Sequence, residues 1–186
     1  MLDIYKMRFS CLIKNKYFKL KSTKSNKLTK SEIRQICFLK NMQWKFGMKS
    51  QLKWFKYNIK KYDIHNLLYI RSKLAGYTLL RKRNYKIHDL SKKISYLYFD
   101  TLVVDKKYRG RKLSKLLMNF NNRIIKKSGF SSFLVCSDEF VNFYKNNNWK
   151  KLNRKLFNIV DHPFSSNGMI FNKKIPKRKI SYYFNE

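Results

Sequence analysis

The feature that most constrains this chain is a long apolar run that leads almost directly into a helical pattern. Residues 94–105 read ISYLYFDTLVVD and are rich in β-branched and aromatic side chains, as expected for a strand covered on both faces. After a short basic loop, apolar residues recur at helical spacing up to Ser128 and Gly129, a predicted C-terminal glycine cap. The apolar residues of this helix are Leu113, Leu116, Leu117, Phe120 and Ile124. A buried strand followed at once by an amphipathic helix predicts a sheet with helices packed against it.

The segments before this unit predict two helices and a hairpin. A capping box at residues 29–32, Thr-Lys-Ser-Glu, predicts the start of the first helix. A second helix is expected after Gly47, with one apolar face formed by Met48, Leu52, Phe55 and Ile59. Residues 65–72 and 73–83 then read as strands that should pair as an antiparallel hairpin. The turn of this hairpin is expected at about Lys73, Leu74 and Ala75.

The segments after this unit predict another buried strand at 130–137 and a short helix that begins at Ser137-Asp138-Glu139. The asparagines at 146–148 should end that helix, and two strands are expected at 149–160 and 168–174. No repeat or linker divides the chain, so we expect one domain over residues 1–186. Its predicted class is mixed α/β (α+β), a single sheet flanked by helices.

Charge and composition limit the function classes. With 44 Lys and Arg against 10 Asp and Glu, the formal net charge is +34. This excess favours a polyanionic partner, such as nucleic acid or an acidic carrier protein; the alternative is the codon bias of AT-rich coding sequence. No apolar run approaches the roughly 20 residues of a membrane span, and no signal peptide is evident, so we expect a cytoplasmic protein. Three scattered cysteines and three separate histidines support neither a metal site nor a disulfide framework.

The basic loop at 108–114, YRGRKLS, has a chemistry of its own. A strand that turns abruptly into a helix leaves the first-turn N–H groups unpaired, and these form an anion site. Gly110 would let the backbone approach a phosphate closely, and Arg109, Arg111 and Lys112 could add side-chain contacts. The alternative is a simple connection whose cations are solvated.

Two linked motifs in residues 94–152 make the chain resemble the GNAT (GCN5-related N-acetyltransferase) superfamily. The first is the strand end Leu102-Val103-Val104 with the following Tyr108-Arg109-Gly110. The second, a helix and a strand later, is CSDEFVNFYKNNNWKKL at 136–152. The resemblance implies a mostly antiparallel central sheet, a splayed central strand and an acyl-CoA cleft. It also implies that acetyl-CoA is bound by Leu102, Val103, Val104, Arg109, Gly110, Arg111, Lys112, Leu113 and Ser114.

The same resemblance implies two catalytic residues. Tyr144 would protonate the departing CoA thiolate, and Asp100 would act through water as the base that deprotonates the amine. Tyr98 lies two places earlier on the strand and is the alternative base. Core packing of Tyr144, or a structural ion pair of Asp100, would be the alternative to these roles.

The sequence departs from the family at three positions. Lys112 stands where the family has glycine, Ser114 where it has glycine or alanine, and Asn148 where it has glycine. Backbone amides survive these changes, but Lys112 would be strained if its position needs a positive φ. Asn tolerates the left-handed conformation best after Gly.

We therefore expect an N-acetyltransferase that transfers acetyl from acetyl-CoA to an amine in a ternary complex. Residues 149–174 resemble the aminoglycoside 2′-N-acetyltransferase and NodA-like branch. The charge of +34 favours a neutral or anionic acceptor over a polycationic one, because like charges repel. A basic nucleic-acid-binding protein, in which Lys and Tyr of residues 53–63 contact the nucleic acid, is the alternative. A third reading is a GNAT fold that has lost catalysis through Lys112 and Ser114.

Overall fold

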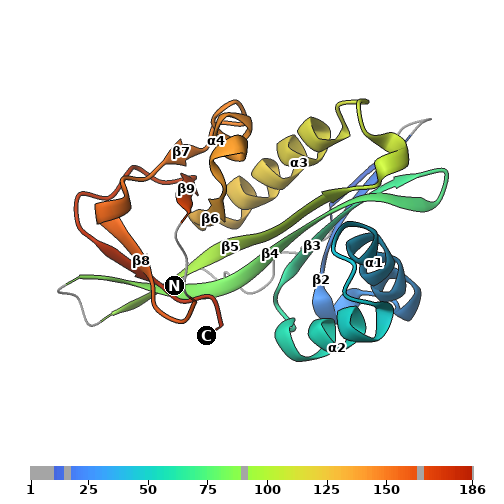
Figure 1. The fold of residues 1–186 in the computed structure, drawn as a ribbon, viewed down its shortest axis with the longest axis horizontal. Helices are drawn as coiled ribbons and strands as arrows, with labels where there is room; N and C mark the ends of the chain where they lie inside the picture. Colours follow the sequence, from blue (N-terminus) through green and yellow to red (C-terminus); the bar gives the residue numbers. More distant parts are fainter. Residues whose placement is uncertain (1–10, 15–17, 89–91, 163–165, 186) are drawn as a thin grey trace.

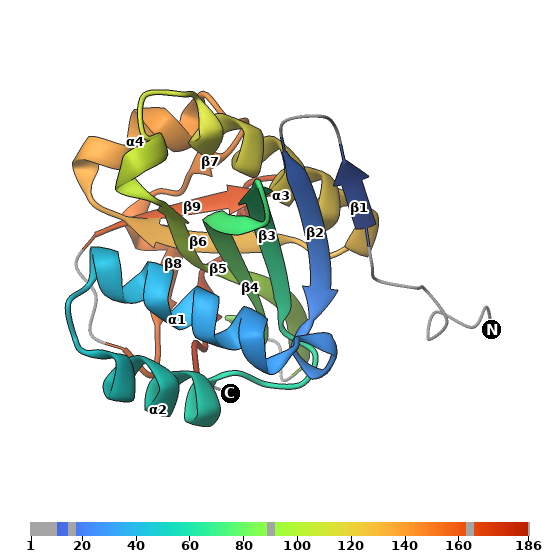
Figure 2. The same ribbon diagram turned by 90° about the vertical axis from the view of Figure 1, so that its right-hand side faces the viewer.

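The computed structural model describes residues 11–14, 18–88, 92–162 and 166–185. Over these residues the chain forms one sheet with helices on both faces (Figures 1 and 2). The helices are α1 (Lys30–Gln43), α2 (Met48–Asn58), α3 (Leu113–Ser128) and α4 (Asp138–Lys145). The strands are β1 (Cys11–Lys14), β2 (Lys19–Lys24), β3 (Ile64–Ile70), β4 (Lys73–Ile87), β5 (Lys93–Val104), β6 (Ser132–Cys136), β7 (Lys150–Lys151), β8 (Phe157–Ile159), β9 (Asn167–Phe171) and β10 (Ile180–Tyr182).

The described strands form a ten-stranded, mostly antiparallel sheet in the order β1-β2-β3-β4-β5-β6-β9-β7, with β10 paired to β4 and β8. The parallel pairs are β5 with β6 and β8 with β10. This confirms the predicted mixed α/β class. None of the helices in the described part is both long and apolar enough to cross a bilayer.

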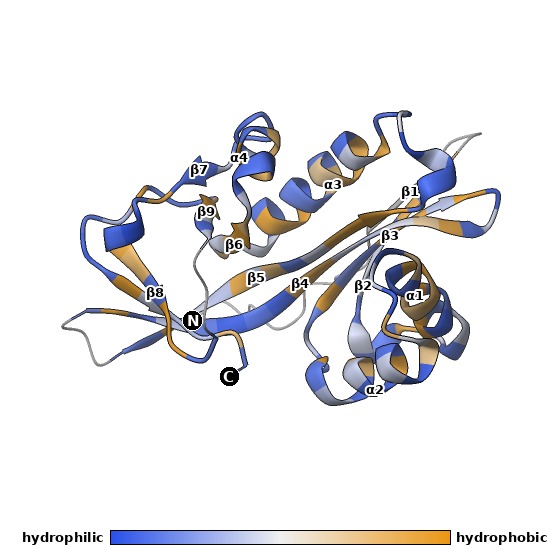
Figure 3. Cartoon of the chain, in the orientation of Figure 1, coloured by the Kyte–Doolittle hydropathy of each residue, from blue (hydrophilic) through white to orange (hydrophobic). Residues whose placement is uncertain are grey.

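The two faces of the sheet bury separate cores. α3 and α4 pack on one face, where Leu117, Ile124 and Trp149 are buried, whereas α1 and α2 pack on the other, over Leu67 and Tyr77. Figure 3 shows the apolar residues concentrated between the helices and the sheet and the polar ones outside. The predicted apolar stripe of α3 is therefore a core stripe, and Gly129 ends the helix in the left-handed conformation with φ 73°.

Both N-terminal helices form where they were predicted. At the start of α1 the Thr29 side chain accepts from the Glu32 N–H, and the Glu32 carboxylate accepts from the Thr29 N–H. The expected inner face of α2 needs one correction, because Leu52 is 37% exposed and Gln51 is buried instead. The Gln51 amide donates to the Trp44 carbonyl oxygen, which ties α2 to the end of α1.

The hairpin of β3 and β4 exists, but its turn was misplaced. The chain reverses at Arg71 and Ser72, which have φ 46° and 66°, whereas Leu74 and Ala75 are buried within β4. Two-residue hairpin turns with positive φ usually carry Asn or Gly. Arg-Ser lacks that signal, so the sequence did not reveal the turn.

The prediction of one strand at 149–160 was wrong. This segment contains the short strand β7, a 3-10 helix at Arg154–Leu156 and then β8. The Asn153 side chain accepts from the Lys155 N–H and so stabilises the break. The terminal strands β1, β2 and β10 were not anticipated, and residues 1–10 and the side chain of Cys11 lie outside the described residues.

Candidate functional site

The cleft begins where two parallel strands separate. β5 pairs with β6 only at Leu97 and Tyr98, although β5 continues to Val104. On its other side β5 remains paired with β4 to its end, where the Asp105 N–H donates to the Ala75 carbonyl oxygen. Hydrogen-bonding direction alternates along an antiparallel strand, so the N–H groups of Leu102 and Val104 point toward the open side. The predicted splay of the central strand is present.

The loop 109–114 follows β5 and leads into α3, whose N-terminus has no side-chain cap. Gly110 and Lys112 both have positive φ, 79° and 56°, and no side chain caps the first turn of α3. The first intrahelical bond runs from the Leu116 N–H to the Lys112 carbonyl oxygen, which leaves the N–H groups of Leu113 and Ser114 without helical partners. A Cβ on Gly110 would meet no atom within 4 Å. The loop therefore presents backbone donors to an accessible space, as a phosphate site requires.

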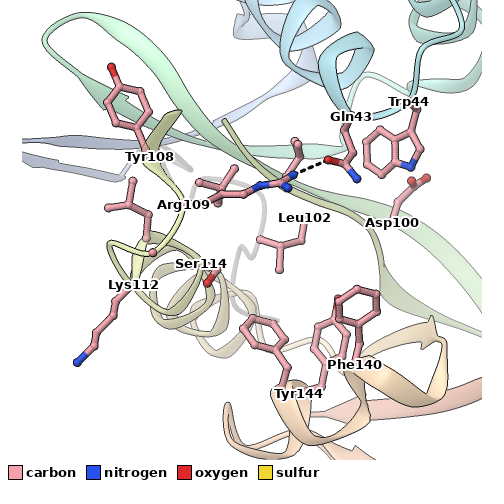
Figure 4. Close-up of a pocket in the computed structure, with 15 residues that line it drawn as sticks. Gln43, Trp44, Asp100, Leu102, Tyr108, Arg109, Lys112, Ser114, Phe140 and Tyr144 are labelled. Carbon is pink, nitrogen blue, oxygen red and sulfur yellow. Dashed lines mark hydrogen bonds between the residues drawn. The ribbon is translucent and has the colours of Figure 1, made fainter. Parts of the chain in front are cut away.

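The three cations of this loop take different positions. The Arg109 guanidinium donates to the Gln43 side-chain oxygen at 2.6 Å and so links the loop to the end of α1 (Figure 4). The Arg111 guanidinium stands 5.8 Å from the centre of the Tyr108 ring. The Lys112 side chain points away from the centre of the cleft in Figure 4, which leaves the amides in front of it uncovered.

A cleft of about 640 Å³ joins these features. We call it the main cleft. Every residue predicted to bind the cofactor or to act in catalysis lines it, with the exception of Arg111. Those lining residues are Asp100, Leu102, Val103, Val104, Arg109, Gly110, Lys112, Leu113, Ser114 and Tyr144. Gln43, Trp44, Tyr108, Phe140 and Phe143 also line the main cleft; Gln43 and Trp44 carried no recognisable signal in the sequence.

Tyr144 lies on α4, across the main cleft from Asp100 (Figure 4). Its ring packs edge-on against Phe99 and Trp149, with ring centres 6.2 and 6.1 Å apart. Burial, helped by the nearby Cys136 thiol, raises the pKa of the Tyr144 phenol, so the hydroxyl keeps its proton near neutral pH. Among the described residues no hydrogen-bond partner of this hydroxyl is present. A partly buried phenol with no partner among the described residues is free to bond to a ligand.

Asp100 occupies a bulge in β5. Leu79 pairs with Thr101 and Leu80 with Phe99, so Asp100 is the extra residue of the ladder. Bulges re-aim side chains and are frequent beside active sites. The Asp100 carboxylate accepts from the Arg81 guanidinium at 2.9 Å and from the Thr101 hydroxyl at 3.1 Å.

The alternative base, Tyr98, does not line the main cleft. Its ring stacks on Phe184 at 3.9 Å, and burial raises the pKa of its phenol. A phenol that holds its proton this firmly is a poor base, so the geometry favours Asp100 over Tyr98.

A second pocket of about 460 Å³ opens beside the main cleft and shares Trp44 and Asp100 with it. We call it the aromatic pocket. It lies between the ends of α1 and α2, and its remaining lining residues are Lys40, Phe46, Ser50, Gln51, Trp54 and Thr101. Sequence reasoning assigned no site role to any of these residues. Within the described residues, no group of three or more His, Cys, Asp or Glu side chains is placed to hold a metal ion.

The turn after α4 contains Asn148, the third position at which the sequence departs from the family. Asn148 has φ 67°, in the left-handed region that glycine and asparagine tolerate best. The prediction that Asn148 substitutes conservatively for glycine agrees with this backbone.

Comparisons with known proteins support the fold. No protein-family model and no curated protein matches this sequence. The chain is similar in structure to Escherichia coli ElaA, with a TM-score of 0.59 and 14% identity over 82% of this chain and 98% of that one. It is similar to an acyl-CoA N-acyltransferase from Pseudomonas aeruginosa, with a TM-score of 0.60 and 11% identity over 82% and 98%. An aminoglycoside 6′-N-acetyltransferase complexed with coenzyme A gives a TM-score of 0.58 and 12% identity over 84% and 99%. The chain therefore has the fold of the GCN5-related N-acetyltransferases, as its two motifs predicted.

Proposed function

We propose that this chain is an acyl-CoA-dependent N-acyltransferase that transfers an acetyl group from acetyl-CoA to an amine in a ternary complex. The observation that carries the proposal is the convergence of three groups on one cleft. The uncapped α3 N-terminus lies at one end, and Tyr144 and Asp100 line opposite sides of it. The solved structures of the same fold add support, since two of those compared above are described as acyltransferases.

The loop 109–114 fits the pyrophosphate of coenzyme A. The N–H groups of Leu113 and Ser114 would donate to its oxygens, and the helix dipole adds roughly half a positive charge at this point. Gly110 leaves room for the phosphates, because nothing lies within 4 Å of where its Cβ would be. Arg109 is held by Gln43 beside the same space. When bound, acetyl-CoA supplies an acyl group already activated as a thioester.

Residues on β5 would position the acyl group. The N–H groups of Leu102 and Val104 point into the splay, where they can donate to the acyl carbonyl oxygen. Such fixed donors stabilise the negative charge that develops on that oxygen in the transition state.

Asp100 and Tyr144 would move the two protons. Asp100 retains lone pairs beyond those used by Arg81 and Thr101, so it can accept the ammonium proton directly or through water. The amine nitrogen then bonds to the acyl carbon as the carbon–sulfur bond breaks. Tyr144 gives its hydroxyl proton to the departing sulfur, and its raised pKa keeps that proton available. The nitrogen then carries one proton more than an amide holds and passes it to the Tyr144 phenolate, which restores the phenol.

A thermal-shift comparison tests this function. Acetyl-CoA, CoA and heparin are added separately, at low and at physiological salt. We expect saturable stabilisation by acetyl-CoA and CoA that persists in salt, since the bound state is favoured by mass action. Equal shifts from all three compounds that vanish in salt would show nonspecific attraction to a chain of charge +34 and would contradict the proposal.

One observation favours a second candidate function, binding to single-stranded nucleic acid. In residues 53–63 Phe55 is buried and Trp54 half-buried, but Tyr57 is 71% and Tyr62 51% exposed. The Lys56 ammonium lies 5.8 Å from the centre of the Tyr57 ring, and the Lys61 ammonium lies 4.8 Å from that of Tyr62. Exposed rings among cations can stack on bases. Titration with single-stranded DNA in moderate salt tests this role, and unchanged affinity after replacing both tyrosines by serine would exclude stacking there.

The acceptor of the first function is constrained by charge. A polycationic aminoglycoside would be repelled by a chain of net charge +34. We therefore favour a neutral or anionic acceptor, or an acyl donor carried on an acidic protein, over the 2′-N-acetyltransferase branch.

A further inference from the structure

The aromatic pocket is lined by one buried cation and one carboxylate, and a second cation lies next to it. Lys40 lines it and is only 7% exposed, and its Nζ lies 3.6 Å from the centre of the Trp54 ring. The Arg81 guanidinium carbon lies 5.7 Å from the centre of the same ring. Asp100 is the carboxylate that faces both cations, and Arg81 is bonded to it. Two cations thus share one carboxylate.

Lys40 has no anionic partner of its own. Among the described residues the Lys40 ammonium forms no ion pair and donates no hydrogen bond. It makes a cation–π contact with the Trp54 ring. The charged or titratable groups that act on it are Asp100, Arg81 and the Cys37 thiol. Burial lowers the pKa of Lys40, and Asp100 counters part of that effect. A buried cation with only partial compensation is costly, and a bound anion would remove that cost.

Beside Ser50, Gln51 and Thr101, the aromatic pocket presents large apolar side chains. The indoles of Trp44 and Trp54 and the ring of Phe46 line it, and Phe46 is 72% exposed at the rim. Such surfaces favour a planar apolar group packed against them. Trp44 and Asp100 also line the main cleft, so a molecule in the aromatic pocket would have one end at the proposed site of acyl transfer.

Resting on the acyltransferase function proposed above, we propose that the acceptor is a small amine that also carries a carboxylate and a flat apolar body. Lys40 binds the carboxylate, the indoles of Trp44 and Trp54 pack against the body, and Asp100 receives the amine at the junction with the main cleft. A neighbouring cation and carboxylate thus suit the carboxylate and the ammonium group of one zwitterionic molecule. Electrostatic complementarity of this kind selects between ligands of similar shape.

A matched pair of probes tests the proposal. L-Tryptophan and tryptamine share the indole and the amine and differ in the carboxylate. Calorimetric titration without acetyl-CoA should give a Kd for L-tryptophan about tenfold lower than for tryptamine, the usual effect of one charge-assisted hydrogen bond. Lys40→Met, which keeps the apolar stem and removes the charge, should abolish this ratio.

Lys49→Met is the matched control, because Lys49 is exposed on α2 and its loss changes the net charge equally. It should leave the ratio of the two Kd values unchanged, and Lys40→Arg should keep most of it. Equal affinities for both probes in the native chain, no binding of either, or a ratio that survives Lys40→Met would each overturn the proposal. The native-chain comparison decides the question even if Lys40→Met does not fold.

Failure of this inference and failure of the proposed function have different signatures. If acetyl-CoA binds with saturation but the probes show no carboxylate preference, the acceptor class is wrong and the acyltransferase function stands. If acetyl-CoA does not bind but Lys40 still selects L-tryptophan, the aromatic pocket is a carboxylate site and the acyltransferase function is wrong. With both intact, N-acetylated L-tryptophan should form faster than N-acetyltryptamine at equal low concentrations.

Discussion

The two neighbouring cavities of this molecule are built from different materials. Around the loop 109–114 the main cleft offers backbone N–H groups, and its cations are exposed or turned outward. The aromatic pocket instead offers side chains, with Lys40 buried against Trp54 and Asp100 held by Arg81. Backbone donors depend on chain geometry, whereas the pocket depends on residue identity. Side-chain substitutions should therefore have small effects on ligand binding around the loop and large effects in the aromatic pocket.

Among the residues that line the main cleft, Tyr144 is the one whose side chain we expect to affect turnover most. Tyr144→Phe removes the hydroxyl and keeps the ring against Phe99 and Trp149. Turnover should fall by about 10²- to 10⁴-fold, the usual contribution of a general acid. Steady-state kinetics measure this loss, and the Kd of acetyl-CoA should stay unchanged. Native turnover in Tyr144→Phe would remove Tyr144 from the mechanism and leave it a core aromatic.

Asp100 tests the aromatic pocket, because its charge is shared with buried cations. Asp100→Asn keeps the shape but leaves Arg81 without its ion pair, which should lower the free energy of unfolding by about 3 kcal/mol. Urea unfolding measures this loss. Arg81→Met combined with Asp100→Asn removes both charges and should be less destabilised than Asp100→Asn alone. If that double variant also recovers turnover, Asp100 is a structural partner of Arg81 and not the base.

Ser114 tests the loop by separating side chain from backbone. Ser114→Ala keeps the N–H and should leave the Kd of CoA unchanged. Ser114→Pro lies in the first turn of α3, where the helix tolerates proline, but it removes the N–H. Its Kd for CoA should rise about tenfold, as for loss of a hydrogen bond to a charged group. Calorimetry measures both, and a larger effect from alanine than from proline would show that the hydroxyl binds the phosphate.

The same difference explains what could be predicted from the sequence. The strand at 94–105, the glycine of the loop and Phe143-Tyr144 are contiguous signals at fixed spacing, so the main cleft could be located before the structure was known. The aromatic pocket joins Lys40, Trp54 and Asp100 from three separate elements. Lys40 and Trp54 also read as ordinary positions on amphipathic helices. Only tertiary packing, including the bulge that re-aims Asp100, brings them together.

The fold divides along the same line. α1 and α3 carry a capping box and a glycine cap, and both form as predicted. The turn at Arg71 and Ser72 and the break at Asn153 depend on backbone conformations that these residue types adopt less often or signal weakly. Short strands such as β10 form through pairing with β4 and β8 and not through their own pattern.

The smallest expected effects concern two residues that stand where the GNAT superfamily has glycine. Lys112 and Asn148 both have positive φ, 56° and 67°. Lys112→Gly should raise the free energy of unfolding by about 1 kcal/mol, because lysine is strained in the left-handed region. Asn148→Gly should change it by only a few tenths of a kcal/mol, because asparagine is nearly as tolerant as glycine there. Urea unfolding of the two variants measures the difference.

The Kd of CoA for the Lys112→Gly variant then shows whether the Lys112 side chain takes part in phosphate binding. The Lys112 ammonium points away from the centre of the main cleft, so the Kd of CoA should stay close to native in moderate salt while stability rises. That result would show a strained but intact backbone site, in which the lysine is a tolerated departure. A clear loss of CoA affinity would instead mean that Lys112 turns inward to bind phosphate, and the loop would then depend on residue identity as the aromatic pocket does.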